Sequence, residues 1–471
     1  MTDARLLDRV LRVLSGPLMR RARDRLGGSH TVVTYPPLDA LDPLLDGEEK
    51  LAIQPPVGPL HYYFHIAFCE HICDFCHYTK TRHTPERPSP EADDYIEALE
   101  SETARRRKAL AGSNVASIFV GGGTPTALSE QHLGRVMEMA ASVAGRAQPR
   151  ICVETSPITL AAADGRDKLQ LLVESGTDRL SIGVQTFDKD LLPPLRRHDL
   201  PTLLVALDML KATGISFNVD LIQDLAGQTR DSIENDLRFV DRYRPDQVTW
   251  YLLRLHSPSV MARRSAGGAP FFVGDTESAC RRAMIIEGMM SLGYRREPGG
   301  RFTLTGEQDT YKAVRGGLDS HLLGLGASAY SHGWGWFFRN VTHSNARIAI
   351  RDYVARIRTG QTPIAWATAI TPEERFAGQL CQLSRQHIPG DMVGGDDPAA
   401  VAARETIDAL VDSGLMAGDE SGWAPTETGW LFEEEIASLF YSKRIRARLQ
   451  ALDAYWIAER PRGAGDARAS A

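Results

Sequence analysis

Three cysteines in one short stretch are the residues best suited to chemistry. Cys69, Cys73 and Cys76 form the pattern Cys-x3-Cys-x2-Cys. The run 62–68 before them is aromatic and apolar, which is typical of a buried strand, so the thiols are expected on a tight loop at a strand end. Thiolates are the usual ligands of iron in iron–sulfur clusters. A four-iron cluster wants four ligands and no fourth cysteine lies nearby, so one iron would stay open to a small molecule.

Other uses of three cysteines remain open. Structural zinc prefers four ligands, so His71 or His77 would have to complete the site. Buried inert cysteines are common, but three within eight residues are hard to explain by packing alone. Disulfides are disfavoured in a reducing compartment. The spacing favours the cluster, with zinc as its main competitor.

Glycines and polar residues follow other apolar runs. The run Gly-Gly-Gly-Thr-Pro-Thr at 121–126 would let the backbone approach a ligand closely, although such a run can also be a simple tight turn. Glu154 follows apolar residues, and because an unpaired buried charge is costly, its carboxylate indicates a ligand contact more than a surface salt bridge. Gln185 would hydrogen-bond a polar cofactor atom.

A repeating pattern of strand and helix would position these residues. The runs expected to form strands are 62–68, 116–120, 151–154, 179–184, 217–222 and 247–253. The segments expected to form helices include 91–110, 129–144, 188–195, 201–213 and 231–242. Such alternation implies parallel strands with right-handed crossovers. Six units predict an α/β fold, a partial (β/α)6 barrel, with the motifs at the C-terminal ends of its strands.

The cysteine stretch resembles the radical S-adenosylmethionine (SAM) enzymes. The residues around it, 63–69 and Phe75, resemble the HemN-like branch of oxygen-independent coproporphyrinogen oxidases, and the run 179–187 is close to that family's fourth-strand signature. The resemblance covers about residues 30–440. It implies a [4Fe-4S] cluster held by the three cysteines, which are therefore also the catalytic centre, with SAM chelated by the open iron. It also implies a second SAM molecule.

The resemblance assigns SAM contacts residue by residue. The positions concerned are Tyr63, Phe75, Gly122, Gly123, Thr124, Glu154, Gln185, Arg197, Asp220, Arg254 and Tyr330. Gly122–Thr124 and Glu154 would contact the first SAM. Arg197 and Asp220 would hold the second, because Arg suits its carboxylate and Asp its charged amine. Tyr63 and Phe75 are aromatic walls for an adenine, or equally core packing.

The chain divides into five expected segments. These are an N-terminal helix and extended arm at 1–50, the barrel at 51–275, a barrel-closing and substrate region at 276–370, a small, mainly α, winged-helix-like C-terminal domain at 371–460, and a disordered tail at 461–471. Further helices are expected at 276–292, 344–358 and 372–386, with short helices around 422–426. The C-terminal domain lacks a clear basic stripe, so DNA binding is not predicted.

Composition limits the class of protein, its cellular compartment and the partners that it can bind. The 471 residues are 43% hydrophobic and 24% charged, as in ordinary soluble globular proteins. The net charge of −6 gives no global attraction for nucleic acid or an anionic membrane, and no run approaches the ~20 apolar residues of a membrane span. Six cysteines, three of them clustered, indicate a cytoplasmic protein. The resemblance implies a small-molecule substrate and a flavodoxin- or ferredoxin-type electron donor.

Three reactions or roles occur in the family that the chain resembles. Residues 77–82 are unlike those of the porphyrinogen oxidases and look more like those of one-carbon-transfer enzymes. The aromatic residues 334 and 336–338 suit a flat substrate or a domain interface. The sequence-based prediction is therefore C-methylation or cyclopropanation of an sp2 carbon of a natural-product intermediate, as in antibiotic biosynthesis. The alternatives are oxygen-independent coproporphyrinogen III oxidation, for which Arg82, Arg254 and Arg339 could bind carboxylates, and a non-enzymatic haem chaperone.

Overall fold

The protein comprises two compact units that are described separately. The structure, a computed structural model, describes residues 4–26, 34–44, 47–84, 89–145, 148–196, 198–253, 274–304 and 320–459. The larger unit consists of the described parts of 41–253 and 285–370, and the smaller unit of the described parts of 1–40, 254–284 and 371–471. Helix α10 (Asp275–Ser291), which agrees with the helix expected at 276–292, runs across the boundary at residue 284. Among the described residues, no helix is both long and apolar enough to cross a membrane.

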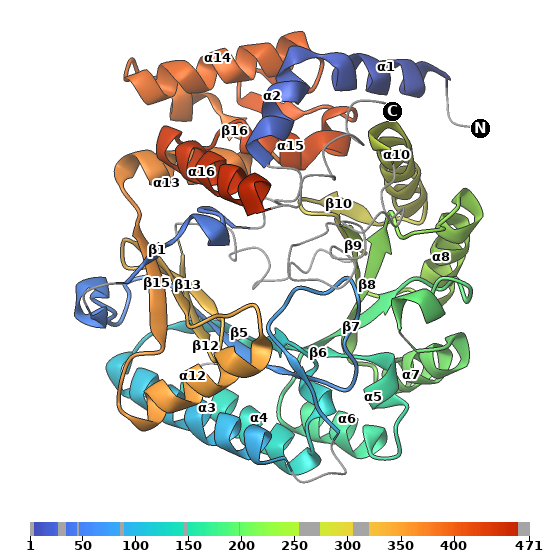
Figure 1. The fold of residues 1–471 in the computed structure, drawn as a ribbon. Helices are drawn as coiled ribbons and strands as arrows, with labels where there is room; N and C mark the ends of the chain where they lie inside the picture. Colours follow the sequence, from blue (N-terminus) through green and yellow to red (C-terminus); the bar gives the residue numbers. More distant parts are fainter. Residues whose placement is uncertain are drawn as a thin grey trace. The chain divides into compact units, whose positions relative to one another are not determined.

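Six parallel strands form the centre of the larger unit (Figure 1). They are, in spatial order, β2 (Leu60–Ile66), β5 (Val115–Gly122), β6 (Arg150–Thr155), β7 (Arg179–Gln185), β8 (Ser216–Gln223) and β9 (Gln247–Leu252). The helices on their outer side are α3 (Pro90–Ala109), α4 (Glu130–Ala144), α6 (Gly165–Glu174), α7 (Leu200–Thr213) and α8 (Arg230–Tyr243). The predicted partial (β/α)6 barrel is therefore confirmed.

Side-chain caps explain where several of these helices begin. The Ser129 side chain accepts a hydrogen bond from the His132 amide at the start of α4. Thr229 and Ser232 form a reciprocal capping box at the start of α8. Such caps satisfy amide groups that have no partner within the helix, so they fix the first turn of each crossover helix.

The crossover after β7 differs from the prediction. Residues 188–195 were expected to be helical, but they form turns and only a short 3-10 helix, Pro193–Leu195. Two successive prolines remove two backbone donors, so an α-helix cannot run through them. The connection instead uses α7, while the crossover after β6 uses α6, a helix that the sequence analysis did not name.

The six strands are part of a larger sheet than the sequence suggests. Beyond β2 it continues through β12 (His321–Leu325), β13 (Tyr330–Gly333), β14 (Trp336–Asn340), β15 (Ile364–Ala369) and β1 (Asp42–Pro43), and beyond β9 through β11 (Arg301–Thr303) and β10 (Arg295–Glu297). Only β12 among these added strands pairs in parallel, with β2. The expected helix at 344–358 is α12 (Ala346–Arg358). The barrel-closing region is thus largely β-structure, which was not predicted.

The two faces of the central strands differ in polarity. Val153, Leu180, Val219 and Val248 are buried and alternate along their strands with polar residues. The polar set lies in register across neighbouring strands: Glu154, Ser181, Asn218 and Gln247. Because side chains alternate between faces, the apolar set meets the outer helices and the polar set lines the inside of the barrel.

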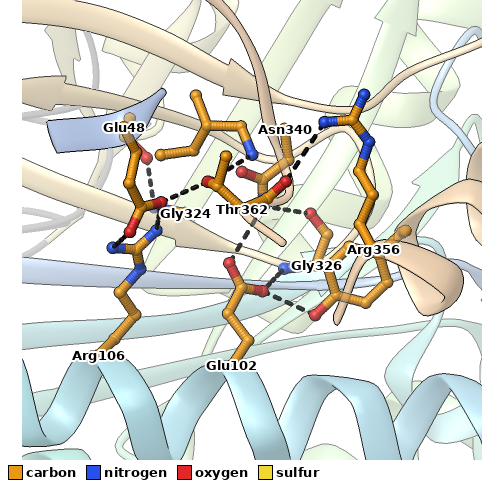
Figure 2. A network of polar contacts seen from close by, with 11 residues as sticks. Glu48, Glu102, Arg106, Gly324, Gly326, Asn340, Arg356 and Thr362 are labelled. Atoms are coloured by element: carbon orange, nitrogen blue, oxygen red, sulfur yellow. Dashed lines mark hydrogen bonds and ion pairs between the residues drawn. The ribbon is translucent and has the colours of Figure 1, made fainter. Parts of the chain in front are cut away.

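A buried carboxylate ties the added strands to the barrel helices (Figure 2). Glu102 on α3 is 1% exposed and accepts hydrogen bonds from the Gly326 amide (2.9 Å), the Tyr353 hydroxyl (2.7 Å) and the Asn340 amide nitrogen (3.4 Å). Burial and then the Glu102 charge raise the pKa of Tyr353 well above its usual value, so its hydroxyl remains a donor. One side chain of α3 therefore fixes the turn after β12, strand β14 and helix α12.

A second contact in Figure 2 lies one turn further along α3. The Arg106 guanidinium binds both carboxylate oxygens of Glu48, at 3.1 and 2.8 Å. Burial disfavours the charge on Glu48, but Arg106 outweighs this effect and lowers the pKa of Glu48. Glu48 also accepts a hydrogen bond from Thr362, so the pair connects α3 with two segments far apart in the sequence.

Replacement of Glu102 by alanine should destabilise the protein by about 3–5 kcal/mol, because it leaves several buried donors without an acceptor. The measurement is urea unfolding of the wild type and the variant, followed by circular dichroism. Glu97→Ala is the matched control, since Glu97 lies on the same helix with its side chain 62% exposed and should cost at most about 1 kcal/mol. Equal losses in the two variants would contradict this account of Glu102.

The smaller unit combines helices from both ends of the chain. Its helices are α1 (Ala4–Ser15), α2 (Pro17–Leu26), α13 (Pro372–Leu383), α14 (Pro398–Asp412), α15 (Glu433–Ser438) and α16 (Lys443–Glu459). The hydroxyl of Tyr35 donates to the buried Glu374 carboxylate, which also accepts from Ser442 (2.8 Å) and Arg444 (2.9 Å). The N-terminal arm is therefore fixed on the C-terminal helices, while the five predicted segment boundaries stay predictions.

Short helices were expected around residues 422–426, and α14 and α15 lie on either side of them in the sequence. Gly422–Pro425 itself forms strand β18, which lies between β16 (Ile388–Pro389) and β17 (Met416–Asp419) in a small antiparallel sheet that was not predicted. A Cβ atom on Gly422 would lie 2.0 Å from the Ile388 carbonyl oxygen, and its φ is +142°. Glycine is needed there because the two strands approach closely.

Candidate functional site

The three cysteines lie on one loop at the C-terminal end of β2. The loop begins at β3 (Phe68–Cys69) and returns through β4 (Thr81–Arg82), which pairs in parallel with β3. Cys69 and Cys73 are buried, and Cys76 is half-buried. The Cys76 amide donates to the Cys73 carbonyl at 3.2 Å, which closes a tight turn between the last two thiols. The predicted gathering of thiols at a strand end is therefore present.

The glycine motif packs directly on this loop. The Gly123 amide donates to the Ile66 carbonyl (2.8 Å) and the Thr124 amide to the Phe68 carbonyl (2.7 Å). The Thr124 hydroxyl lies 3.4 Å from the Cys69 sulfur. A Cβ atom on Gly123 would lie 2.2 Å from the Phe68 carbonyl oxygen, so glycine is required for this approach. The end of β5 thus forms one wall of the cysteine loop.

Glu154 lies beside the glycine motif. Its Oε2 accepts a hydrogen bond from the Gly122 amide at 2.8 Å. Gly122 has a φ of +102°, and a Cβ atom there would lie 2.3 Å from the His65 ring and 2.8 Å from the Tyr63 hydroxyl oxygen. Strands β2, β5 and β6 therefore bring Tyr63, Gly122 and Glu154 together.

His65 is a residue of this site that the sequence analysis missed. Its Nε2 lies 2.8 Å from the Thr79 carbonyl and its Nδ1 lies 3.0 Å from the Tyr63 hydroxyl. Burial lowers the pKa of His65 to about 4, so the ring is neutral at pH 7. Because Nε2 faces a carbonyl it carries the hydrogen, and Nδ1 accepts from Tyr63. Its position two residues after Tyr63, on the same strand face, was the available signal.

Asp220 is held by neighbours on its own and the adjacent strand. Its carboxylate accepts from the Ser181 hydroxyl (3.1 Å) and the Asn218 amide nitrogen (2.8 Å). The Thr249 hydroxyl donates to the Asn218 side-chain oxygen at 3.0 Å. Asp220 and Glu154 are partly exposed, whereas Ser181, Asn218 and Thr249 are at most 1% exposed. The two carboxylates are therefore accessible at the end of a buried polar layer that presents them.

Gln185 ends β7 in a conformation that its neighbours fix. It is buried, has a φ of +75° and lies at an irregularity in the pairing of β7 with β8. The two residues after it are bound by Asp236 of α8, which accepts from the Phe187 amide (2.6 Å) and the Thr186 hydroxyl (3.0 Å). Asp236 thus positions the loop that follows Gln185.

The burial of Asp236 predicts a pH effect on stability. Burial raises its pKa to about 8, which outweighs the lowering by Phe187 and Thr186. Between about pH 4 and pH 8 the folded state therefore holds one more proton than the unfolded state, and stability falls as pH rises, by at most about 1.4 kcal/mol per pH unit. Asp236→Asn removes this dependence and should gain stability relative to the wild type from pH 5.5 to pH 8.5 in urea unfolding. Asp241→Asn, at an exposed position of α8, is the control; a constant difference between Asp236→Asn and wild type would refute the prediction.

Four further residues were predicted to contact SAM, and the structure describes two of them, Tyr330 and Phe75. Tyr330 packs against a core cluster that contains Tyr63, Phe119 and Cys152, and Phe75 is half-buried on the cysteine loop. Arg197 and Arg254 lie outside the described residues. The predicted SAM contacts of all these residues stay predictions.

The expected aromatic mouth at 334–338 is partly wrong. Phe337 and Phe338 on β14 are each 1% exposed, so they are core residues and cannot line an opening. Trp334 donates from its ring nitrogen to the Gln54 carbonyl at 2.7 Å. Adjacent side chains of a strand point to opposite faces, so both faces of β14 are covered at Phe337 and Phe338. The sequence run alone did not reveal that strand.

Two acidic residues within the cysteine loop connect it to the next strands. Glu70 accepts a hydrogen bond of 2.5 Å from Ser156, which follows β6. Asp74, 1% exposed, lies 3.6 Å from the guanidinium of Arg196, which follows the 3-10 helix Pro193–Leu195 in the β7–α7 connection. The loop is therefore held by residues after β5, β6 and β7, all at the same end of the sheet.

The cysteine loop supplies three thiols that suit a [4Fe-4S] cluster. The thiolates that hold such a cluster bind different irons, and Cys69, Cys73 and Cys76 lie on one loop at a strand end. Burial, and then the neighbouring Glu70, raise the pKa of the Cys69 thiol, so a bound metal group would be needed to keep it as a thiolate.

Comparisons with known proteins agree with this geometry. Residues 63–240 match the family model of the Radical SAM superfamily. The heme chaperone HemW of Bacillus subtilis is 26% identical over 392 residues, which cover 80% of this chain and 98% of that protein. The oxygen-independent coproporphyrinogen III oxidase of Escherichia coli is 33% identical over 210 residues, 44% of each chain.

A solved structure shares the fold over most of the chain. It is coproporphyrinogen III oxidase (HemN) from Escherichia coli, described as a radical SAM enzyme. The TM-score is 0.74 at 24% identity, and the match covers 87% of this chain and 96% of the other. By its barrel, its cysteine loop and these relatives, the chain carries a radical SAM domain, matched over residues 63–240, and is similar to HemN-like proteins in sequence and fold.

Proposed function

We propose that this chain cleaves SAM reductively and uses the resulting radical on a tetrapyrrole. The observation that carries the first half is the packing of the cysteine loop on Gly123 and Thr124, with Glu154 bound to the adjacent Gly122 amide. The superfamily implies a [4Fe-4S] cluster and SAM, which when bound supply an electron and a 5′-deoxyadenosyl radical. The protein supplies ligands, orientation and exclusion of water.

The roles of the residues follow from their positions. Cys69, Cys73 and Cys76 would hold three irons and leave the fourth for SAM. The Gly122–Thr124 backbone and the partly exposed Glu154 carboxylate would hold the SAM amino group, since a carboxylate pairs well with an ammonium. Asp220, presented by Ser181 and Asn218, would hold the amine of a second SAM, together with Gln185 and Arg197.

The substrate class rests on the relatives and on two arginines. The two curated relatives described above are named for haem and for coproporphyrinogen, which are both tetrapyrroles. Arg82 is exposed and pairs in β4 with Cys69, and Arg339 of β14 donates to the Ser328 carbonyl at 3.2 Å. Guanidinium groups near the cysteine loop would suit propionate carboxylates. These points favour coproporphyrinogen oxidation over the one-carbon transfer that the sequence alone predicted.

One-carbon transfer remains a second candidate because of the residues after the cysteines. His77 and Tyr78 stack at 4.8 Å between ring centroids and are exposed. The hydroxyls of Thr79 and Ser328 lie 2.7 Å apart, which fixes the returning segment. The sequence of this segment differs from that expected of the porphyrinogen oxidases, which supports different surroundings for the substrate.

Product analysis of the reconstituted protein separates the candidates. The protein is incubated without oxygen with SAM, dithionite and coproporphyrinogen III, and 5′-deoxyadenosine and tetrapyrrole products are measured by mass spectrometry. Conversion of propionate to vinyl groups supports the oxidase. A methylated product, with deuterium passing from the SAM methyl group into 5′-deoxyadenosine, supports one-carbon transfer. Haem binding with no 5′-deoxyadenosine above background contradicts the proposal and supports a haem carrier.

A further inference from the structure

Lys80 is a buried cation with no carboxylate partner among the described residues. Only 8% of the surface of Lys80 is exposed to solvent. Its Nζ donates to two neutral acceptors, the carbonyl oxygens of Cys76 (3.4 Å) and Tyr78 (3.2 Å). A buried ammonium is costly unless a negative charge lies close to it. Among the residues that the structure describes, the contacts of this charge are therefore carbonyl oxygens rather than acidic side chains.

The cysteines are the groups of this loop that become anionic when they bind a metal group. Lys80 donates from its Nζ to the carbonyl of Cys76, one of the three predicted ligands, and lies on the same loop as Cys69 and Cys73. The two carboxylates of the loop contact other groups, Glu70 the Ser156 hydroxyl and Asp74 the Arg196 guanidinium. The amine also reaches the loop from its returning segment, four residues after Cys76, so it moves with the ligands themselves.

We propose that the Lys80 ammonium is the fixed counter-charge of the iron–sulfur cluster and makes the cluster easier to reduce. This inference rests on the proposed function, because it needs the cluster to be present. A cluster held by three thiolates is anionic, and the electron it accepts from dithionite or from a physiological donor adds a further negative charge. A fixed positive charge in a site of low polarity stabilises the reduced form more than the oxidised form.

A structural role is the alternative that the test must exclude. Lys80 could act only by bracing the loop through its two carbonyl contacts. Lys80→Gln keeps a donor and removes the charge, whereas Lys80→Arg keeps the charge on a different donor geometry. The two variants therefore separate charge from hydrogen bonding.

The readout is the midpoint potential of the cluster rather than enzyme activity. We expect the ratio of reduced to oxidised cluster in Lys80→Gln to fall about tenfold at a fixed potential, as loss of one nearby charge implies. For a one-electron couple this is a lowering of the midpoint potential by about 59 mV. Lys80→Arg should retain the wild-type value. Lys108→Met, which removes an exposed lysine at the end of α3, is the control for total charge and should also retain it.

The experiment is a redox titration of reconstituted, SAM-free protein, followed by the electron paramagnetic resonance signal of the reduced cluster. Iron and sulfide contents are measured first, and a wild type that holds neither overturns the cluster and this inference together. With the cluster present, equal midpoint potentials in wild type and Lys80→Gln overturn the inference alone. A Lys80→Gln variant that loses iron while Lys80→Arg keeps it also supports a required counter-charge, provided that circular dichroism shows both to be folded.

Discussion

Replacing Cys73 with alanine is expected to remove the iron–sulfur cluster and to reduce SAM cleavage to background. Cys73 is buried in the turn that the Cys76 amide closes, and among the described residues no other cysteine lies on that loop except Cys69 and Cys76. Two thiolates cannot satisfy a cluster that already has one open iron, so the loss of one ligand leaves two irons without protein ligands. Iron and sulfide content, visible absorption and 5′-deoxyadenosine formation are the measurements.

Cys280→Ala is the matched control for this variant. Cys280 lies on α10, outside the cysteine loop, and is half-buried. Its removal should leave iron content and 5′-deoxyadenosine formation at the wild-type level. Full iron content in Cys73→Ala would show that the three-cysteine ligand set is wrong.

The central strands were predictable from sequence because each is a short apolar run bounded by turn residues. All six expected strands are present, and the helices expected at 91–110, 129–144, 201–213 and 231–242 are present as α3, α4, α7 and α8. The repeated order of strand and helix supported the strand assignment, because each parallel strand–helix unit predicts where the next strand must lie. The segment 188–195 failed because its apolar residues resembled a helix face, while Pro193 and Pro194 decided its backbone.

The strands added beyond β2 were not predictable in the same way. The run 324–330 is rich in glycine, and tertiary contacts explain why glycine is needed at position 326. A Cβ atom on Gly326 would lie 2.6 Å from the Tyr95 hydroxyl oxygen and 2.7 Å from the His65 carbonyl oxygen. Such a requirement comes from a neighbour more than 200 residues away in the chain. Local propensity, which disfavours glycine in strands, also points away from β12, which contains Gly324 and ends one residue before Gly326.

The candidate site was predictable where a motif ends a strand. Gly122, Glu154 and the cysteines were placed together because the C-terminal ends of parallel strands meet at one edge of the sheet. The sequence analysis missed four residues of the site, His65, Ser181, Asn218 and Lys80. Their roles depend on partners from other strands or on burial, and neither can be read from a single sequence. Substrate choice is harder still, since it depends on loops that are separate in sequence; residues 77–82 alone favoured one-carbon transfer, while the relatives named for tetrapyrroles favour another outcome.

Replacing Gly123 with alanine should detach the glycine motif from the cysteine loop. The added Cβ would lie 2.2 Å from the Phe68 carbonyl oxygen and 2.6 Å from that of Ile66, and neither backbone atom can move as a flexible side chain would. The shift would break the hydrogen bonds that Gly123 and Thr124 donate to these carbonyls. Two lost backbone hydrogen bonds and the steric conflict should cost about 2–4 kcal/mol of stability and weaken SAM binding at least about tenfold.

Urea unfolding of the cluster-free protein and SAM titration of the reconstituted protein by calorimetry measure the two effects. Gly134→Ala is the control, because Gly134 lies within α4 and an added Cβ would meet only a Leu171 methyl carbon at 3.7 Å. Alanine favours a helix interior by about 0.5–1 kcal/mol over glycine, so this variant should be as stable as wild type or slightly more stable. If Gly123→Ala binds SAM as tightly as Gly134→Ala, the contact between β5 and the cysteine loop does not shape the SAM site, and the amide of Gly122 and the carboxylate of Glu154 must do so without it.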